Sequence, residues 1–239
     1  MIKTVLFDLD GTLLPMDNNE FTKYYFGLLC KKLAPKGYKT EELIDAVWTG
    51  TAAMVKNDGS RPNEDAFWEK FAQILGPQVL DDKATFEDFY QHEFDGARAV
   101  CGFDQKLVDI VKYLHENNIR VGLATNPIFP LIATEKRIDW AGFKPEDFEI
   151  VTTYESIGYC KPNPEYYSEV LRRMGAKPEE SLMVGNDVNE DLVAEKIGMK
   201  VFLLTDNVLN KDNKDYSSYP NGDAVALKAY IDSLIVQGE

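Results

Sequence analysis

The stretch Ile2–Thr12, IKTVLFDLDGT, decides the fold, because an apolar run leads directly into two carboxylates. The run Ile2–Phe7 predicts a buried strand. Side chains two residues apart leave a strand on the same face, so Asp8 and Asp10 would project together from its carboxyl end. Their backbones would lie roughly 6 to 7 Å apart, which leaves room for a transferring group or a metal ion. The alternative is a plain turn after the strand, since Asp and Gly are common turn residues.

Two carboxylates this close repel each other unless a positive charge lies between them. A hard cation that prefers oxygen ligands meets this need, and Mg²⁺ is the usual one. The acidic pair therefore predicts Mg²⁺ as the cofactor.

The composition is that of an ordinary soluble globular chain of 239 residues, 44% of them apolar. A formal charge of -14 argues against a nucleic-acid partner, which needs clustered Lys and Arg. Three scattered cysteines and the absence of an 18-residue apolar window favour a cytoplasmic protein with no membrane partner. We expect a small-molecule phosphoester as the partner, and a monomer or weak homodimer.

The hydrophobic pattern differs between two parts of the chain. Residues 16–98 show almost only helical spacing, whereas short apolar runs alternate with amphipathic helices from Gly102 onward, which is typical of a parallel sheet. The expected helices of the first part are Glu20–Leu33, Thr40–Val55, Asn63–Leu75 and Thr85–Arg98. In the second part we expect strands at Ile119–Ala124, Phe148–Thr152, Ser181–Val184 and Lys200–Leu204, and helices at Asp104–Glu116, Leu131–Trp140, Pro164–Met174, Asn189–Ile197 and Asp223–Val236.

The first strand has no partner in the helical part, so it belongs with the later strands. The sequence thus predicts an α/β core at 1–15 and 99–239, interrupted by a helical cap domain at 16–98. The expected core is a Rossmann-like parallel sheet with helices on both faces.

Ligands of an open parallel sheet bind beyond the carboxyl ends of its strands. Polar residues follow each predicted strand there. Thr125 offers a hydroxyl that suits a phosphate oxygen, and Lys161 offers a compact positive charge. The segment from Asn186 to Asp191 adds oxygen ligands for Mg²⁺. Pro162, directly after Lys161, restricts the lysine to an extended lead-in, and Asn163-Pro164 predicts the start of a helix.

These residues resemble the four motifs of the haloacid dehalogenase superfamily. The motifs read VLFDLDGTLL at Val5–Leu14, LATNP at Leu123–Pro127, CKPNP at Cys160–Pro164 and MVGNDVNED at Met183–Asp191. The match covers the core, and the helical insertion resembles the helical-cap (C1) subgroup, which holds phosphoglycolate phosphatases, nucleotidases and β-phosphoglucomutases.

The resemblance implies a Mg²⁺-dependent phosphatase acting on a small phosphorylated metabolite. Asp8 would attack phosphorus to form an aspartyl-phosphate, and Asp10 would act as acid and then base. Thr125 and Lys161 would hold the phosphoryl group, together with Leu9 and Asn126. Mg²⁺ would lie between the Asp8 carboxylate, the Asp10 backbone carbonyl and the fourth motif.

The fourth motif departs from the family pattern, because most phosphatases have Gly-Asp where this chain has Gly185-Asn186. Either Asn186 is a neutral metal ligand, or Asp187 makes the direct contact.

Three other functions stay open. A dehalogenase would leave Asp10 without a task. A phosphosugar mutase differs only in the acceptor of the phosphoryl group, and the motifs do not separate it from a phosphatase. A non-catalytic phosphate-binding protein could share the fold. Substrate choice would come from the cap, where we expect Trp48 to pack rather than to contact substrate.

Overall fold

A parallel sheet forms the centre of the molecule. The computed structural model describes residues 1–236. Its strands are β1 (Thr4–Phe7), β2 (Arg120–Leu123), β3 (Ser181–Gly185), β4 (Lys200–Leu204) and β5 (Asn221–Gly222). They lie in the order β2-β1-β3-β4-β5, and every pairing is parallel. The strand predicted from the opening run is therefore central, which places the residues after it in the middle of the sheet edge.

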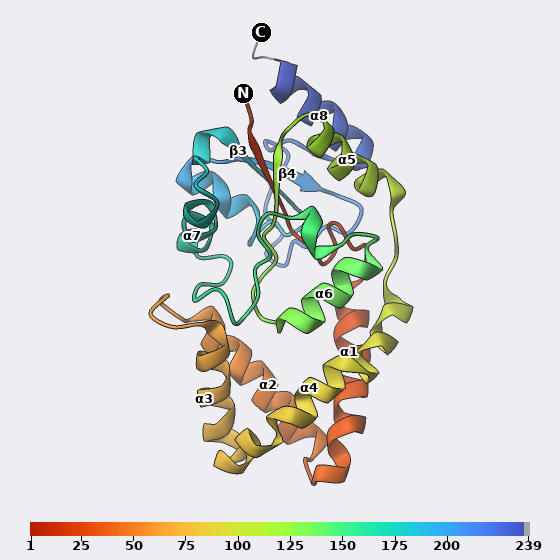
Figure 1. The fold of residues 1–239 in the computed structure, drawn as a ribbon, viewed down its shortest axis with the longest axis vertical. Coiled ribbons are helices and arrows are strands. Elements are labelled where there is room, and N and C mark those ends of the chain that lie inside the picture. The colour runs from red at the N-terminus through yellow and green to blue at the C-terminus, as the bar shows by residue number, and fades with distance from the viewer. Residues whose placement is uncertain (237–239) are drawn as a thin grey trace.

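Helices cover both faces of this sheet, which confirms the predicted α/β fold. They are α5 (Gln105–Glu116), α6 (Leu131–Trp140), α7 (Pro164–Met174) and α8 (Ala224–Val236). Val5 and Phe7 of β1 share a buried cluster with residues of α5 and α8, whereas Leu6 between them belongs to a second cluster with residues of α7. Figure 1 shows α5 and α8 on one side of the strands and α7 on the other.

The chain between β1 and α5 folds into helices that gather at one end of the molecule, away from both termini (Figure 1). These are α1 (Asn18–Leu33), α2 (Thr40–Val55), α3 (Asn63–Leu75) and α4 (Lys83–Gln91). That residues 16–98 form a domain of their own stays a prediction. No helix within residues 1–236 is both long enough and apolar enough to cross a membrane.

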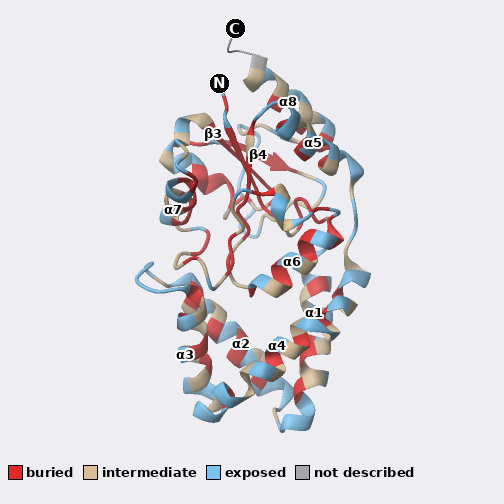
Figure 2. Cartoon of the chain, in the orientation of Figure 1, coloured by how far each residue is buried: buried red, intermediate tan, exposed pale blue. Residues whose placement is uncertain are grey.

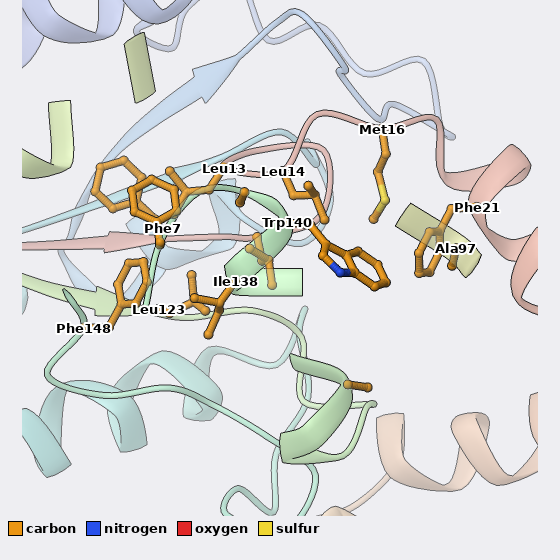
Figure 3. Packing of buried hydrophobic residues seen from close by; sticks show 14 of the residues in the cluster. Phe7, Leu13, Leu14, Met16, Phe21, Ala97, Leu123, Ile138, Trp140 and Phe148 are labelled. Carbon is orange, nitrogen blue, oxygen red and sulfur yellow. The ribbon is translucent and has the colours of Figure 1, made fainter. Parts of the chain in front are cut away.

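The apolar core runs without a break from the sheet into this helical end. Phe7 and Leu123 of the sheet belong to the same cluster as Phe21 of α1, and Figure 3 shows Trp140 of α6 between the two ends. Trp140 stacks on Phe94 with ring centroids 5.2 Å apart. In Figure 2 the labelled strands β3 and β4 are mostly buried, whereas the helices carry exposed residues on their outer sides.

Three predicted elements differ in the structure. Phe148–Thr152 lies along β2 with three backbone hydrogen bonds, but it forms only one isolated bridge, between Leu123 and Val151, and is not a full strand. Phe148 instead closes a turn of 3₁₀ helix with its N–H on Pro145. The predicted helix Thr85–Arg98 divides at His92 into α4 and a 3₁₀ helix, η3 (Glu93–Val100).

The helix predicted at Asn189–Ile197 is shorter and is a 3₁₀ helix, η6 (Leu192–Ile197). The residues before it form a turn, because Asp187 Oδ1 accepts the N–H groups of Asn189 and Glu190 at 2.7 and 3.1 Å. Such a side-chain bond competes with helix formation. Between β4 and the last helix, where no strand was predicted, lies the short strand β5.

Candidate active site

The residues that follow the strands meet at one edge of the sheet, as the sequence led us to expect. Asp8 follows β1, Thr125 follows β2, and Asn186 and Asp191 follow β3, while Lys161 arrives on the loop before α7. All five are buried, with at most 8% of any residue exposed. Polar groups this deep need partners, because an unpaired buried charge is costly.

Lys161 connects this group of residues. Its Nζ donates to Asp8 Oδ1 at 2.8 Å and to Asp191 Oδ1 at 2.6 Å. Burial alone would lower the pKa of Lys161, but the two carboxylates outweigh it and hold that pKa well above its ordinary value. Lys161 is therefore a fixed cation inside the protein.

For the pKa of Asp8, burial has a larger effect than the neighbouring lysine. Burial raises the pKa of Asp8 to about 7, although Lys161 lowers it, and the charge of Asp191 raises it further. A second cation beside Asp8 would favour its ionised form, which is the nucleophilic one.

The lead-in to α7 fixes the lysine. Asn163 is the N-cap residue of α7 and accepts the N–H of Glu165 at 3.0 Å, with Pro164 as the first helical residue. This cap confirms the predicted helix start.

Asn186 faces the Asp8 carboxylate with its oxygen. The hydroxyl of Thr12 lies 3.3 Å from Asp8 Oδ2 and 3.0 Å from Asn186 Oδ1, so the two oxygens converge on one point. The Asn186 amide nitrogen donates to the carbonyl of Asn207 at 2.7 Å, which fixes this orientation. A Cβ on Gly11 would lie 2.2 Å from that nitrogen, so only glycine fits there.

Asp187 is engaged differently. Its Oδ1 accepts two backbone N–H groups in the turn before η6, and its own N–H donates to Asp191 Oδ2 at 2.9 Å. Asn186 Oδ1, by contrast, accepts the Thr12 hydroxyl, which also lies next to Asp8 Oδ2.

Within residues 1–236, no three His, Cys, Asp or Glu side chains form a metal cluster. A cation here would need the mixed set of oxygens around Asp8 and Asn186, which suits a hard ion such as Mg²⁺.

Asp10 is held by a residue that the sequence did not reveal. Arg137 of α6 is fully buried and donates from Nη1 to Asp10 Oδ2. Its Nε donates to the Ala133 carbonyl at 3.1 Å, and its guanidinium lies 4.3 Å from the ring centroid of Phe129. Burial raises the pKa of Asp10, while Arg137 and Lys161 lower it. One signal was available: Arg137 falls one helical turn from Ala133 and from Trp140, on the apolar side of the helix.

The remaining predicted residues lie beside this group. Asn126 donates from Nδ2 to Glu190 Oε2 at 3.0 Å. The Thr125 carbonyl accepts the hydroxyls of Thr152 and Tyr166 at 2.6 and 2.8 Å, which holds the loop. Leu9, between Asp8 and Asp10 in the sequence, is fully buried. Its carbonyl accepts the N–H groups of Thr12 and Leu14 and so closes the turn that follows.

A cavity of about 600 Å³ opens from this edge toward the helical end. Asp8, Asp10, Thr125, Asn126 and Asn186 line one end of it, and residues of α1 to α4 line the other. Its size falls within the range of small-molecule sites, roughly 300 to 1,000 Å³.

Comparison with known proteins gives relatives along most of the chain. A family model for haloacid dehalogenase-like hydrolases matches residues 2–198. Pyrophosphatase PpaX of Anoxybacillus flavithermus is 26% identical over 200 residues, which is 83% of this chain and 81% of that protein. The PpaX of Halalkalibacterium halodurans is 25% identical over 203 residues, covering 85% of this chain and 83% of the relative.

Solved structures share the fold at lower identity. A HAD phosphatase from Thermococcus onnurineus superposes with a TM-score of 0.62 at 18% identity, over 96% of this chain and 98% of that one. A 2-haloacid dehalogenase from Pseudomonas syringae pv. Tomato DC3000 superposes with a TM-score of 0.65 at 18% identity, over the full length of both chains.

Proposed function

This chain belongs to the haloacid dehalogenase-like hydrolases, and we propose that within this family it is a Mg²⁺-dependent phosphatase of small phosphomonoesters. The observation that carries the proposal is the buried lysine between two carboxylates at the end of the cavity. Lys161 touches Asp8 and Asp191, so it can balance a phosphoryl group at Asp8 without solvent.

The reaction would have two steps. Asp8 would attack phosphorus, so that a carboxylate oxygen forms the new bond while the ester bond to the alcohol breaks, and Asp10 would give its proton to the leaving oxygen. Water would then attack the aspartyl-phosphate, with Asp10 taking the water proton and Asp8 leaving as a carboxylate. Thr125 and Lys161 would hold the phosphoryl oxygens through both steps.

Asp8, the backbone carbonyl of Asp10 and the amide oxygen of Asn186 would hold Mg²⁺. When bound, the ion would supply positive charge against the repulsion between Asp8 and the incoming phosphate. Asn186 is our choice over Asp187, because the Asp187 carboxylate already accepts two backbone N–H groups.

The phosphatase assignment is favoured over a dehalogenase by Asp10. A dehalogenation releases halide, which needs no proton, whereas a leaving alkoxide does. Arg137 holds the Asp10 carboxyl at the cavity, as expected for a group with a task there. The three cysteines that the structure describes are free thiols, which fits the cytoplasm we propose as its location.

The test is phosphate release from p-nitrophenyl phosphate with Mg²⁺. Asp8→Asn should reduce turnover by at least about 10⁴-fold, because no nucleophile remains. Circular dichroism of the variant should match the wild type. Wild-type-like turnover in Asp8→Asn would falsify the proposed mechanism, and transfer of phosphate to an added sugar phosphate instead of water would indicate a mutase.

A further inference from the structure

The far end of the cavity has a chemistry that the proposed reaction does not use. Residues of α1 to α4 give it a wall of aromatic side chains, here called the aromatic wall: Tyr25, Trp48, Phe67, Trp68, Phe86 and Tyr90. A pocket that recognises a sugar or a second phosphate would instead present many hydrogen-bond donors. The wall therefore fits a flat apolar group.

Trp48 is the clearest member of this wall. Despite its size it is 52% exposed and lines the cavity, although it also contacts Phe26 with ring centroids 5.5 Å apart. The sequence led us to expect that it would pack, and it does contact Phe26, but half of its surface stays exposed. A tryptophan face left open on a cavity can bury a ligand ring on binding.

The charges of this end do not provide a site for a second anion. Lys83 is the one lysine that residues 16–98 contribute to the cavity lining, with no arginine among them. Its ammonium lies 4.0 Å from Glu64 and 4.8 Å from the centroid of the Trp68 ring. Glu87 adds a further negative charge to the same end.

Buried polar atoms along the cavity agree with this. Among residues 1–236, the oxygens Asp10 Oδ1, Asn18 Oδ1 and Asn126 Oδ1 and the indole nitrogen Trp68 Nε1 are buried without a hydrogen-bond partner, and all four residues line the cavity. The two amide oxygens need a donor, which a carboxylate or a second phosphate does not bring, and the single indole N–H does not by itself balance an anion.

We propose that the substrate is a phosphomonoester of an alcohol with an uncharged or cationic aromatic body, whose ring rests on the aromatic wall while its phosphate lies at Asp8. This inference rests on the proposed phosphatase function and narrows its substrate. It disfavours compact substrates whose leaving group is itself anionic, such as pyrophosphate and phosphoglycolate.

The experiment compares 2-phenylethyl phosphate with ethyl phosphate in the presence of Mg²⁺. Both release a primary alkoxide of similar basicity, so a difference in kcat/KM reports the ring and not the leaving-group chemistry. We expect 2-phenylethyl phosphate to be favoured by roughly 10- to 100-fold, since buried apolar groups of this size contribute that much. Pyrophosphate and phosphoglycolate should be poorer than 2-phenylethyl phosphate.

Trp48→Ala should raise KM for 2-phenylethyl phosphate about tenfold, with little change in kcat and none for ethyl phosphate. The matched control is Tyr24→Ala, which removes another exposed aromatic ring of the same helical end, 42% exposed, that does not line the cavity. Tyr24→Ala should keep the wild-type preference, and thermal unfolding should confirm that both variants are folded.

Binding gives a readout that does not depend on turnover. In Asp8→Asn, 2-phenylethyl phosphate should change the tryptophan fluorescence at much lower concentration than ethyl phosphate, because Trp48 and Trp68 both line the cavity.

The outcomes separate the two proposals. Equal kcat/KM for the two esters, or a preference for phosphoglycolate, would overturn the aromatic-substrate inference and leave the phosphatase function standing. A preference for pyrophosphate would overturn the aromatic-substrate inference and the choice of a phosphomonoester, and leave phosphoryl hydrolysis standing. Absence of turnover with every phosphoester would overturn both.

Discussion

The two ends of the cavity are built in opposite ways. At the sheet edge, charged side chains are buried and pair with one another, as Lys161 does with Asp8 and Asp191. At the helical end, Lys32 pairs with Asp88 and Glu93, whose side chains are 48% and 40% exposed, and the interior is aromatic. The first arrangement positions the groups that we propose to react with the substrate, and the second provides an apolar surface against which the substrate can bind.

This difference teaches where the chemistry and the selectivity reside. Every group that we propose to act on phosphorus lies on a loop directly after a strand or before a helix of the sheet region. A few neighbouring residues in the sequence therefore determine where each group is placed. The aromatic wall draws on four helices, and no single helix carries it. Substitutions at the two ends should therefore fail in different ways.

The largest combined loss of activity and stability should come from removing the buried cation. Lys161→Met leaves Asp8 and Asp191 facing each other without a counter-ion. We expect turnover to fall by at least about 10³-fold, and the free energy of unfolding to fall by about 3–5 kcal/mol. Urea unfolding and phosphate release measure the two losses.

Lys32→Met is the matched control, because it removes a lysine with two carboxylate partners at the helical end. Solvent screens that pair, so its removal should change neither activity nor unfolding measurably. An equal loss of stability in both variants would break the comparison between the two ends.

The sequence was sufficient wherever a local pattern determines the structure. The placement of Asp8 after a central strand follows from one apolar run, and the start of α7 follows from Asn163-Pro164. The sequence failed where distant segments decide. In the sequence Arg137 looks like a surface charge, and only the packing of α6 places it beside Asp10. Trp48 looks like a core residue, and only the arrangement of the helices places it on a cavity.

The prediction of a strand at Phe148–Thr152 failed for the same reason. Phe148–Thr152 has strand composition, and three backbone hydrogen bonds join it to β2, but within it only Val151 forms a bridge. Pairing is a property of two segments, and the apolar run of one segment does not determine it.

A smaller loss should follow from changing Arg137, which belongs to the core but was invisible in the motifs. Arg137→Lys keeps the charge and loses the planar fork that contacts both Asp10 and the Ala133 carbonyl. We expect kcat to fall by about 10- to 100-fold with KM nearly unchanged, because the acid is misplaced and not removed. Steady-state kinetics measure this split. A rise in KM alone would show that Arg137 acts on substrate binding.

The metal requirement offers a finer test at the sheet edge. Asn186→Ala removes the oxygen that faces Asp8, so the Mg²⁺ concentration for half-maximal activity should rise about tenfold. Asp187→Ala removes a turn-forming carboxylate, and we expect a shift of less than about threefold. A titration of activity against the Mg²⁺ concentration measures both shifts. The reverse order of the two shifts would make Asp187 the direct ligand.

The smallest expected effect lies where the two ends meet. Asn63, the first residue of α3, is fully buried and donates to the carbonyls of Pro127 and Tyr159 at 3.1 and 3.3 Å. Its Nδ2 also lies 3.2 Å from the sulfur of Cys160, the residue before Lys161. Burial raises the pKa of Cys160 to about 12, so in the folded protein this thiol should react more slowly with a thiol reagent than Cys30.

Asn63→Ala should make Cys160 react faster by up to about tenfold, since losing these bonds lets the helical end separate more often from the core. Mass spectrometry of timed labelling measures it, with Cys30 as the internal control. Equal acceleration of both thiols would indicate general loosening instead. The substitution also removes a donor that lowers the pKa of Cys160, which by itself would slow the reaction. Faster labelling would therefore measure opening of the junction and not a change in the thiol.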